Sequence, residues 1–333
     1  MLQTMSMSPV ELPAHPALRP RPLEYAAASG DIADRLGLAL GGAEVHRART
    51  AHLSPFGYYR VVAEQRLFVK VCPRGRLPHL LAVQDLIAQL RGAGCPVQPM
   101  LGAPLDLADN AVGLVYAYIP ERFARDTAAD AARVGLALRS VHEALASIPP
   151  PMAVMPISAQ WRAGLARLGG ASISDDFIVT CANALLSRWD RVADILDRDS
   201  QLIHNDYHRG NVLMGTDGVV AVLDFDDSIS AVASPLVDLA IGLERFCLAD
   251  TPREAGTRLV AAFLEGYGRR MSEISATELE SVALARLLFS LSILHANPRT
   301  GDQGWQAENS KFTGLLRNWP HWRQALIVAG FQP

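Results

Sequence analysis

The sequence predicts an α+β protein with its strands concentrated before residue 120 and its helices dominating after it. Residues 67–71 read LFVKV, an alternation that is typical of a strand. Residues 79–91 and 127–145 instead carry apolar side chains at helical spacing, on one face of each segment. Between residues 211 and 223, two β-rich segments flank a glycine-containing turn, which predicts a hairpin.

The composition is that of a folded protein of moderate size. The chain has 333 residues, half of them hydrophobic, and a net charge of -3. A chain of this length can bury a sizeable core in one or two domains. The near-neutral charge offers no basic face, so we expect no nucleic-acid partner. The four cysteines are widely scattered and show neither metal-ligand spacing nor a disulfide framework.

Two further features concern location. The first 22 residues lack the basic start and apolar block of a secretory signal, so we expect a cytoplasmic protein. The longest apolar run, residues 282–294, is interrupted by Arg286 and is too short to cross a bilayer. We therefore expect a buried helix there and no membrane partner. The sequence leaves the oligomeric state open.

The first third of the chain begins with a proline-rich tail, residues 1–22, for which we expect no regular element. A helix is expected over residues 24–40, ended by two glycines. Strands should follow from residue 43 to 53, over 58–63 and over 67–71.

Lys70 stands out within the last of these strands. The alternation places Phe68 and Lys70 on one face and Leu67, Val69 and Val71 on the other. A lysine in an otherwise apolar strand is costly unless it meets an anion. Two interpretations stay open: Lys70 meets an anion, or it lies at a sheet edge and limits aggregation.

The later elements are mainly helical. A strand over residues 113–119 should end at Pro120, and a capping box at Thr127 and Asp130 should open the helix that ends at residue 145. The other expected helices are one over residues 175–196 and two opened by capping boxes at residues 251–254 and 275–278.

The most informative stretch is residues 201–227, which reads QLIHNDYHRGNVLMGTDGVVAVLDFDD. Pairing centred on the turn would bring Asn211 and Asp224 to face a common point. An amide oxygen and a carboxylate are hard ligands that suit Mg²⁺. Asp206 has no lysine beside it in sequence, and its carboxylate could accept a proton from a hydroxyl. The alternative is an ordinary acidic hairpin after a turn.

These residues resemble a known family. His204, Asp206, His208, Gly210 and Asn211, followed by Asp224-Phe225-Asp226, are similar to the catalytic and metal-binding loops of the aminoglycoside phosphotransferase and choline kinase family. The resemblance implies a protein-kinase-like two-lobe fold that uses ATP and Mg²⁺. By resemblance, residues 1–22 are a tail, 23–120 an N-lobe with antiparallel sheet, and 121–333 a larger, mainly helical C-lobe.

The resemblance also implies roles in chemistry and metal binding. Asp206 would be the catalytic base, and Asn211 and Asp224 would hold Mg²⁺. Asp226 would approach a second Mg²⁺ or orient the loop.

Nucleotide contacts are implied for the N-lobe. Lys70 would meet the α and β phosphates, Ser54 would help a short turn to cradle phosphate, and backbone groups of Tyr116, Ala117 and Tyr118 would hold the adenine. His208 would either brace the loop or touch phosphate.

The family's helix glutamate, which pairs with the strand lysine, is absent. Gln84 or Asp85 stands at the matching positions. Asp85 could pair with Lys70, whereas Gln84 would offer only a neutral hydrogen bond.

The remaining matched residues are expected to support the site. His204 and His142 would be packed, hydrogen-bonding residues, and Asp238 would either tie down the catalytic loop or cap a helix. Fourteen positions separate Asp224 from Asp238, which leaves no room for a peptide-docking segment. We therefore expect a small-molecule partner with a hydroxyl group.

The function implied is ATP- and Mg²⁺-dependent phosphoryl transfer to that hydroxyl. The first expected acceptors are a sugar, an aminocyclitol or an aminoglycoside-type antibiotic. Choline, homoserine or methylthioribose are alternatives. Two rival functions are a non-catalytic nucleotide-binding module, suggested by the missing helix glutamate, and a kinase acting on a protein side chain.

Overall fold

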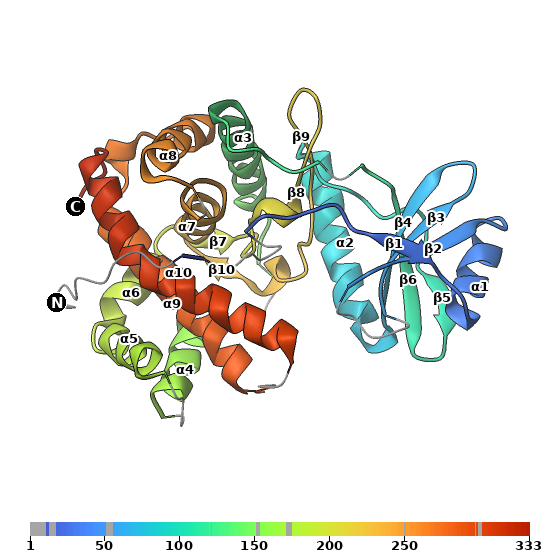
Figure 1. The fold of residues 1–333 in the computed structure, drawn as a ribbon, viewed down its shortest axis with the longest axis horizontal. Helices are drawn as coiled ribbons and strands as arrows, with labels where there is room; N and C mark the ends of the chain where they lie inside the picture. Colours follow the sequence, from blue (N-terminus) through green and yellow to red (C-terminus); the bar gives the residue numbers. More distant parts are fainter. Residues whose placement is uncertain are drawn as a thin grey trace. The chain divides into compact units, whose positions relative to one another are not determined.

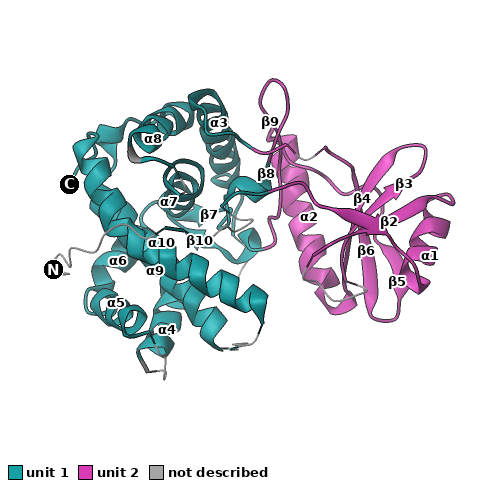
Figure 2. Cartoon of the chain, in the orientation of Figure 1, with its two compact units in different colours: residues 1–20, 124–212, 227–333 teal, residues 21–123, 213–226 magenta. Residues whose placement is uncertain are grey.

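The chain forms two compact units, which are described separately (Figures 1 and 2). Unit 1 contains residues 1–20, 124–212 and 227–333, and unit 2 contains residues 21–123 and 213–226. The computed structural model describes residues 11–12, 18–50, 56–120, 122–150, 154–170, 175–249, 251–296, 298 and 302–333. Unit 2 holds an antiparallel sheet and unit 1 is mainly helical, which confirms the predicted α+β class.

The sheet of unit 2 has six strands in the order β1-β2-β3-β4-β6-β5, and all neighbours are antiparallel. The strands are β1 (Tyr25–Ala27), β2 (Glu44–Ala48), β3 (Gly57–Val62), β4 (Arg66–Pro73), β5 (Leu105–Ala108) and β6 (Ala111–Ala117). Two helices accompany them, α1 (Asp31–Ala39) and α2 (Leu77–Gly92), and a 3-10 turn, η1 (Arg74–Arg76), precedes α2.

The two faces of β4 show why Lys70 lies where it does. Leu67, Val69 and Val71 are buried in the core that also contains Leu36 of α1. Phe68 packs instead against the cluster that includes Leu80 of α2. The alternation predicted for this strand is confirmed, and it turns Lys70 toward the face covered by α2.

A hairpin from later in the chain completes unit 2. It consists of β8 (Val212–Met214) and β9 (Val219–Val222), as the turn chemistry predicted. We expected all residues after 120 in the larger lobe, but residues 213–226 group with unit 2. Backbone hydrogen bonds explain this: the Met214 amide donates to the Arg122 carbonyl (2.7 Å), and the Val222 amide donates to the Pro96 carbonyl (2.6 Å).

Unit 1 is built from helices with two short strands. The helices are α3 (Ala128–Leu145), α4 (Ile157–Gly170), α5 (Asp176–Leu186), α6 (Trp189–Asp197), α7 (Leu236–Gly242), α8 (Arg253–Tyr267), α9 (Ala276–Ala296) and α10 (Gln303–Val328). The short strands β7 (Gln201–Leu202) and β10 (Val232–Ala233) pair antiparallel. Short 3-10 turns are η2 (Arg209–Asn211), η3 (Ser228–Ser230) and η5 (Met271–Glu273), and η4 (Leu243–Leu248) is a π-helix.

Three expected helices differ from what is seen. Residues 25–27 form β1, paired with β2, so the expected helix starts only at Asp31. The helix expected over 175–196 is two helices, α5 and α6, separated at Ser187 and Arg188. The Thr251 hydroxyl donates to the Ala249 carbonyl (3.3 Å) and does not cap α8, so that capping box is wrong.

Helix α9 accounts for the long apolar run. By length and composition, it is the one helix among the described residues that could cross a membrane. In the apolar 18-residue segment of α9 that passes this test, 56% of the residues are buried inside the protein, which is the pattern of a core helix. The expected capping at its start is present, because the Ser275 hydroxyl accepts from the Glu278 amide (3.3 Å).

Candidate active site

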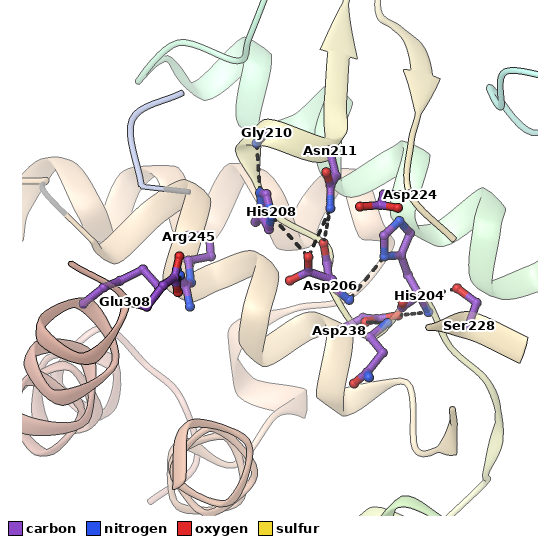
Figure 3. Close-up of polar contacts among 12 residues, drawn as sticks. His204, Asp206, His208, Gly210, Asn211, Asp224, Ser228, Asp238, Arg245 and Glu308 are labelled. Atoms are coloured by element: carbon purple, nitrogen blue, oxygen red, sulfur yellow. Dashed lines mark hydrogen bonds and ion pairs between the residues drawn. The ribbon is translucent and has the colours of Figure 1, made fainter. Parts of the chain in front are cut away.

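The loop after β7 in unit 1 is fixed by one buried carboxylate. Asp238, in the first turn of α7, accepts hydrogen bonds from the backbone amides of His204 and Asn205, both at 2.7 Å (Figure 3). Its Oδ2 atom also lies 3.0 Å from Nε2 of His142, whose Nδ1 lies 2.8 Å from the Tyr267 hydroxyl. Asp238 therefore ties the loop to α7 and to α3, and the N-cap of α7 is Pro235 instead.

Asp206 occupies the centre of this loop (Figure 3). Its Oδ1 accepts from Nη2 of Arg286 at 3.0 Å, and its Oδ2 lies 3.3 Å from both Nδ2 of Asn211 and Nε2 of His208. Burial favours the neutral acid, but His208, Arg286 and His204 outweigh it and hold the pKa of Asp206 far below its usual range. The side chain is still 37% exposed, so an ionised carboxylate remains open to an incoming molecule.

Two histidines shape the loop around this carboxylate. His208 accepts from the Gly210 amide through Nδ1 (3.0 Å), so its Nε2 is left to donate to Asp206. His204 is fully buried and accepts from the Asp206 amide through Nδ1 (3.2 Å). Because both nitrogens of His208 are used within the loop, the geometry supports bracing, rather than phosphate contact, of the two roles considered for it.

Asn211 ends the loop in a defined orientation. Its Nδ2 donates to the backbone carbonyl of Asp206 (3.0 Å). Among the described residues its amide oxygen has no hydrogen-bond donor, so this hard oxygen is left for another ligand.

Arg209 anchors the same loop from beneath. The side chain is buried and donates to the carbonyls of Arg245 (3.0 Å) and Phe246 (2.6 Å), both in the π-helix η4. It also donates to the Ala124 carbonyl (2.9 Å) and pairs with Asp126. A π-helix displaces carbonyls from the α-helical ladder, and Arg209 satisfies two of them. Nothing in the sequence pattern distinguished this arginine from a solvated loop residue.

Unit 2 contains a second charged cluster, centred on Asp226. Nζ of Lys70 lies 3.1 Å from Asp226 Oδ2 and 3.3 Å from Asp224 Oδ1. Nη2 of Arg76 reaches the same Asp226 oxygen at 2.9 Å, and Nε2 of His79 donates to the Asp226 carbonyl at 2.8 Å. Lys70 is thus paired with acidic groups in unit 2, the first of the two interpretations considered for it.

The charges in this cluster stabilise one another. Burial disfavours the cation, but Asp224 and Asp226 raise the pKa of Lys70 above its ordinary value. Burial likewise disfavours the Asp226 anion, but Lys70 and Arg76 lower the pKa of that carboxyl. Asp224 itself has a φ of 61°, in the left-handed region that non-glycine residues rarely occupy. Such backbone strain is concentrated at functional sites.

The expected pairing of Asp85 with Lys70 is wrong. Helix α2 buries Leu80, Val83, Leu86, Ile87 and Leu90, and Asp85 lies on its exposed side. Gln84 faces inward, where it donates to the Tyr116 hydroxyl (3.1 Å) and accepts from the Met100 amide (3.3 Å). The acid that holds Lys70 therefore follows β9 in the chain instead of lying in α2.

The segment expected to hold adenine is partly occupied within unit 2. The Ala117 carbonyl accepts from the Gln98 side chain, and the Tyr118 amide donates to the Arg66 carbonyl (3.0 Å). Burial raises the pKa of Tyr116 to about 12, so its hydroxyl stays protonated. Ser54, expected to cradle phosphate, lies outside the described residues.

A metal would have to be held by few protein ligands. Among the residues that the structure describes, no group of three or more His, Cys, Asp or Glu side chains is arranged so that it could hold a metal ion. Carboxylate and amide oxygens are nevertheless hard ligands, of the kind that leave Mg²⁺ with waters and phosphate oxygens. Taken one by one, Asn211 of unit 1 and Asp224 and Asp226 of unit 2 carry oxygens that suit magnesium rather than zinc.

Arg286 is the functional candidate that sequence reasoning missed, although a signal was present. It is the single charge inside the apolar run of α9, and a charge in such a run needs a partner. That partner is Asp206. Arg76 and His79 carried no comparable signal, because both stand near the polar start of a helix.

Comparison with known proteins places these features in a family. Residues 50–276 match the model of the phosphotransferase enzyme family. Similar solved structures include a microcompartment-associated aminopropanol kinase, 18% identical, which covers 90% of this chain and 98% of its own with a TM-score of 0.61.

Two aminoglycoside-type enzymes are also similar. A spectinomycin phosphotransferase, solved with ADP and spectinomycin, is 14% identical over 93% of this chain and 98% of its own, with a TM-score of 0.58. An aminoglycoside-3'-phosphotransferase of type VIII is 22% identical over 78% of this chain and 98% of its own, with a TM-score of 0.52. At these identities the likeness establishes the fold, which is the expected kinase-like one. None of the curated protein sequences compared matches the chain.

Proposed function

Because the chain belongs to the phosphotransferase enzyme family, we propose that it transfers the γ-phosphoryl group of ATP to a hydroxyl of a small molecule. This proposal rests on the charge, contacts and exposure of the Asp206 carboxylate. This carboxylate is ionised, held on both oxygens by protein donors, and still open to solvent.

Asp206 acts mainly by orienting the acceptor. A carboxylate whose pKa lies far below its usual range is a weak proton acceptor, but it accepts a hydrogen bond from a hydroxyl well. Phosphoryl transfer passes through a loose transition state, in which little basicity is needed before the bond to phosphorus forms. Asp206 therefore contributes more by positioning the hydroxyl than by accepting its proton.

Lys70 is proposed to contact the ATP phosphates. Its pairing with Asp226 and Asp224 keeps it charged and in place without the helix glutamate of the family. For this reason the missing glutamate does not favour a non-catalytic module. We assign Asn211 and Asp224 as Mg²⁺ ligands, and Asp226 as the residue that approaches a second Mg²⁺ or orients the loop, on the family motif and on their donor chemistry. Bound Mg²⁺ would neutralise charge on the phosphates.

The test is acceptor-dependent ATP turnover, measured by mass spectrometry of the phosphorylated product with the wild type and Asp206→Asn. We expect the substitution to lower kcat by roughly 10³-fold or more, since it removes the orienting charge at a nearly unchanged volume. Asp85→Ala is the matched control, because this exposed acid contacts none of the proposed site residues. Equal turnover by wild type and Asp206→Asn would refute the assignment.

A further inference from the structure

Three buried cations gather in unit 1 on the side of Asp206 that Arg286 occupies. Arg245 lies in the π-helix η4, Arg286 in α9 and Lys311 in α10, and their side chains are 3%, 12% and 6% exposed. A charged side chain seldom stays buried without a partner. Their convergence from three separate helices is not required by packing, since an apolar side chain of similar length would fill the same space.

The partners present do not use all of their hydrogen-bonding capacity. Arg286 donates to Asp206 through Nη2, but its Nη1 is buried and has no hydrogen-bond partner among the described residues. Arg245 pairs with Glu244 (2.6 Å), and Lys311 pairs with Glu308 (2.5 Å). A buried unpaired N–H next to the carboxylate of the loop indicates a missing acceptor.

The positive charges also act on one another. Burial and then the charge of Arg245 lower the pKa of Lys311 to about 8, even though Glu308 opposes this change. Burial and Arg245 likewise lower the pKa of Arg286 against the effect of Asp206, Glu244 and Asp238. These acids and Glu308 offset part of the repulsion among the three cations in the free protein, and a bound anion would relieve the rest.

We propose that Arg286, Arg245 and Lys311 form an oxyanion site for the acceptor, so that the preferred acceptor carries a carboxylate or phosphate next to the hydroxyl that is phosphorylated. The inference rests on the proposed kinase function, because it takes Asp206 as the residue that orients the hydroxyl. Arg286 connects the oxyanion site with Asp206. Its planar guanidinium group donates from one nitrogen to Asp206, and the adjacent nitrogen donates to the oxyanion. The two functional groups of the acceptor must then be close neighbours.

This inference selects among the acceptors expected from the sequence. A polycationic aminoglycoside would bring like charges against three buried cations, which is unfavourable. Hydroxy acids and hydroxylated phosphate esters are opposite in charge to the three cations and offer an acceptor for the unpartnered Nη1 of Arg286.

The experiment compares acceptors that share a carbon skeleton. The three-carbon series is glycerate, glycerol 3-phosphate, glyceramide and 3-amino-1,2-propanediol, and the six-carbon series is gluconate, glucose and glucosamine. We expect kcat/KM for an anionic member to exceed that for its neutral or amino analogue by about 10- to 100-fold, which is the range of a charge-assisted hydrogen bond. The ratio between glycerate and glycerol 3-phosphate shows which oxyanion is preferred.

Variants then show whether the named residues are responsible. In Lys311→Met and Arg286→Lys we expect the anion-to-neutral ratio to fall at least fivefold, about 1 kcal/mol of lost discrimination. Arg317→Met, on the same helix α10 but paired with Asp175, should keep the wild-type ratio. The ratio, not the rate, is the readout, because Arg286 also positions Asp206. An amine or neutral compound as the best acceptor, or an unchanged ratio in both variants, would overturn the proposal.

The two proposals fail differently. If no compound gives turnover that depends on Asp206, the kinase function fails for these acceptors. The oxyanion site is then judged from thermal unfolding of the full chain with glycerate, glycerol 3-phosphate or glyceramide. Stabilisation by either anion but not by the amide, lost in Lys311→Met, supports the site. The absence of any such stabilisation overturns it.

Discussion

Lys311 should reduce the stability of unit 1, and Lys311→Met tests this directly. The ammonium is buried in α10 near Arg245 and Arg286 and has Glu308 as its acidic partner. A pKa lowered from 10.5 to about 8 means that the charged form is less stable in the fold than in water by about 3 kcal/mol. At pH 7 the lysine is still protonated, so the full effect is present.

Methionine keeps most of the apolar stem and removes the charge. The pair with Glu308 already opposes the lowering of the pKa, so its loss is contained in this difference. One further loss opposes the gain, the contact of the ammonium with the Phe312 ring at 4.2 Å, which is worth about 1 kcal/mol or less. We therefore expect Lys311→Met to raise the free energy of unfolding of unit 1 by about 1–3 kcal/mol at pH 7.

Urea unfolding followed by tryptophan fluorescence measures the change in the free energy of unfolding of unit 1. All five tryptophans, Trp161, Trp189, Trp305, Trp319 and Trp322, belong to unit 1. The signal therefore reports unit 1 within the full chain. Arg317→Met is the control on the same helix, and since its ion pair with Asp175 is partly exposed it should be neutral or destabilising by less than about 1 kcal/mol.

The stability difference between the wild type and Lys311→Met should change with pH, whereas a simple packing effect would not. The folded pKa of Lys311 is below its unfolded value, so the unfolded chain binds more protons between pH 8 and 10.5. The stability of the wild type relative to Lys311→Met should therefore rise with pH across this window, and the advantage of the variant should shrink. A variant that is less stable than the wild type at pH 7, or an advantage that does not change with pH, would refute the reasoning.

Three further predictions follow from contacts described above. Asp226→Asn should raise the KM for ATP about tenfold, because two cations lose their shared carboxylate, while Asp85→Ala should change it less than twofold in the same assay. Asp238→Asn should lower the stability of unit 1 by about 2–4 kcal/mol in urea, since one amide oxygen replaces two carboxylate acceptors in a buried site. Gly266→Ala should prevent unit 1 from folding, as judged by circular dichroism, because a Cβ there would overlap the backbone of α3, whereas Gly92→Ala meets open space and should be tolerated.

Each of these has a result that contradicts it. Equal KM values for Asp226→Asn and Asp85→Ala would mean that the Asp226 cluster does not position Lys70 for the proposed contact with the phosphates. An unchanged urea midpoint for Asp238→Asn would mean that the loop is held elsewhere. A folded Gly266→Ala protein would show that α3 and α8 can move apart without loss of the core.

The loop around Asp206 could be predicted because its residues are close together in the sequence. His204, Asp206, His208 and Asn211 lie within eight residues, and their spacing alone brings their side chains together. The alternation in β4 is local in the same way, since side chains on a strand must alternate whatever the strand pairs with.

The partner of Lys70 could not be predicted in this way. Asp226 is 156 residues further along the chain, and its pairing with Lys70 depends on where the β8–β9 hairpin packs. Sequence reasoning considered Gln84 and Asp85, because the family carries this partner in the helix that corresponds to α2, but the apolar face of α2 turns Asp85 outward.

Two fold errors have similar physical causes. The break between α5 and α6 at Ser187 and Arg188 follows no glycine or proline, so tertiary packing ends the first helix against its own pattern. In β1, Ala26 and Ala27 suit a helix by propensity, and pairing with β2 makes them a strand instead.

The π-helix η4 makes the register of residues 243–248 sensitive to chain length. Removing one residue from this segment would let it close as an α-helix, and each side chain on one side of the deletion would rotate by about 100° about the helix axis. Arg245 would then leave its neighbours, and the carbonyls that Arg209 binds would return to the helical ladder. A single-residue deletion here should therefore disturb the loop around Asp206 and the buried cations together, while leaving the rest of the sequence intact.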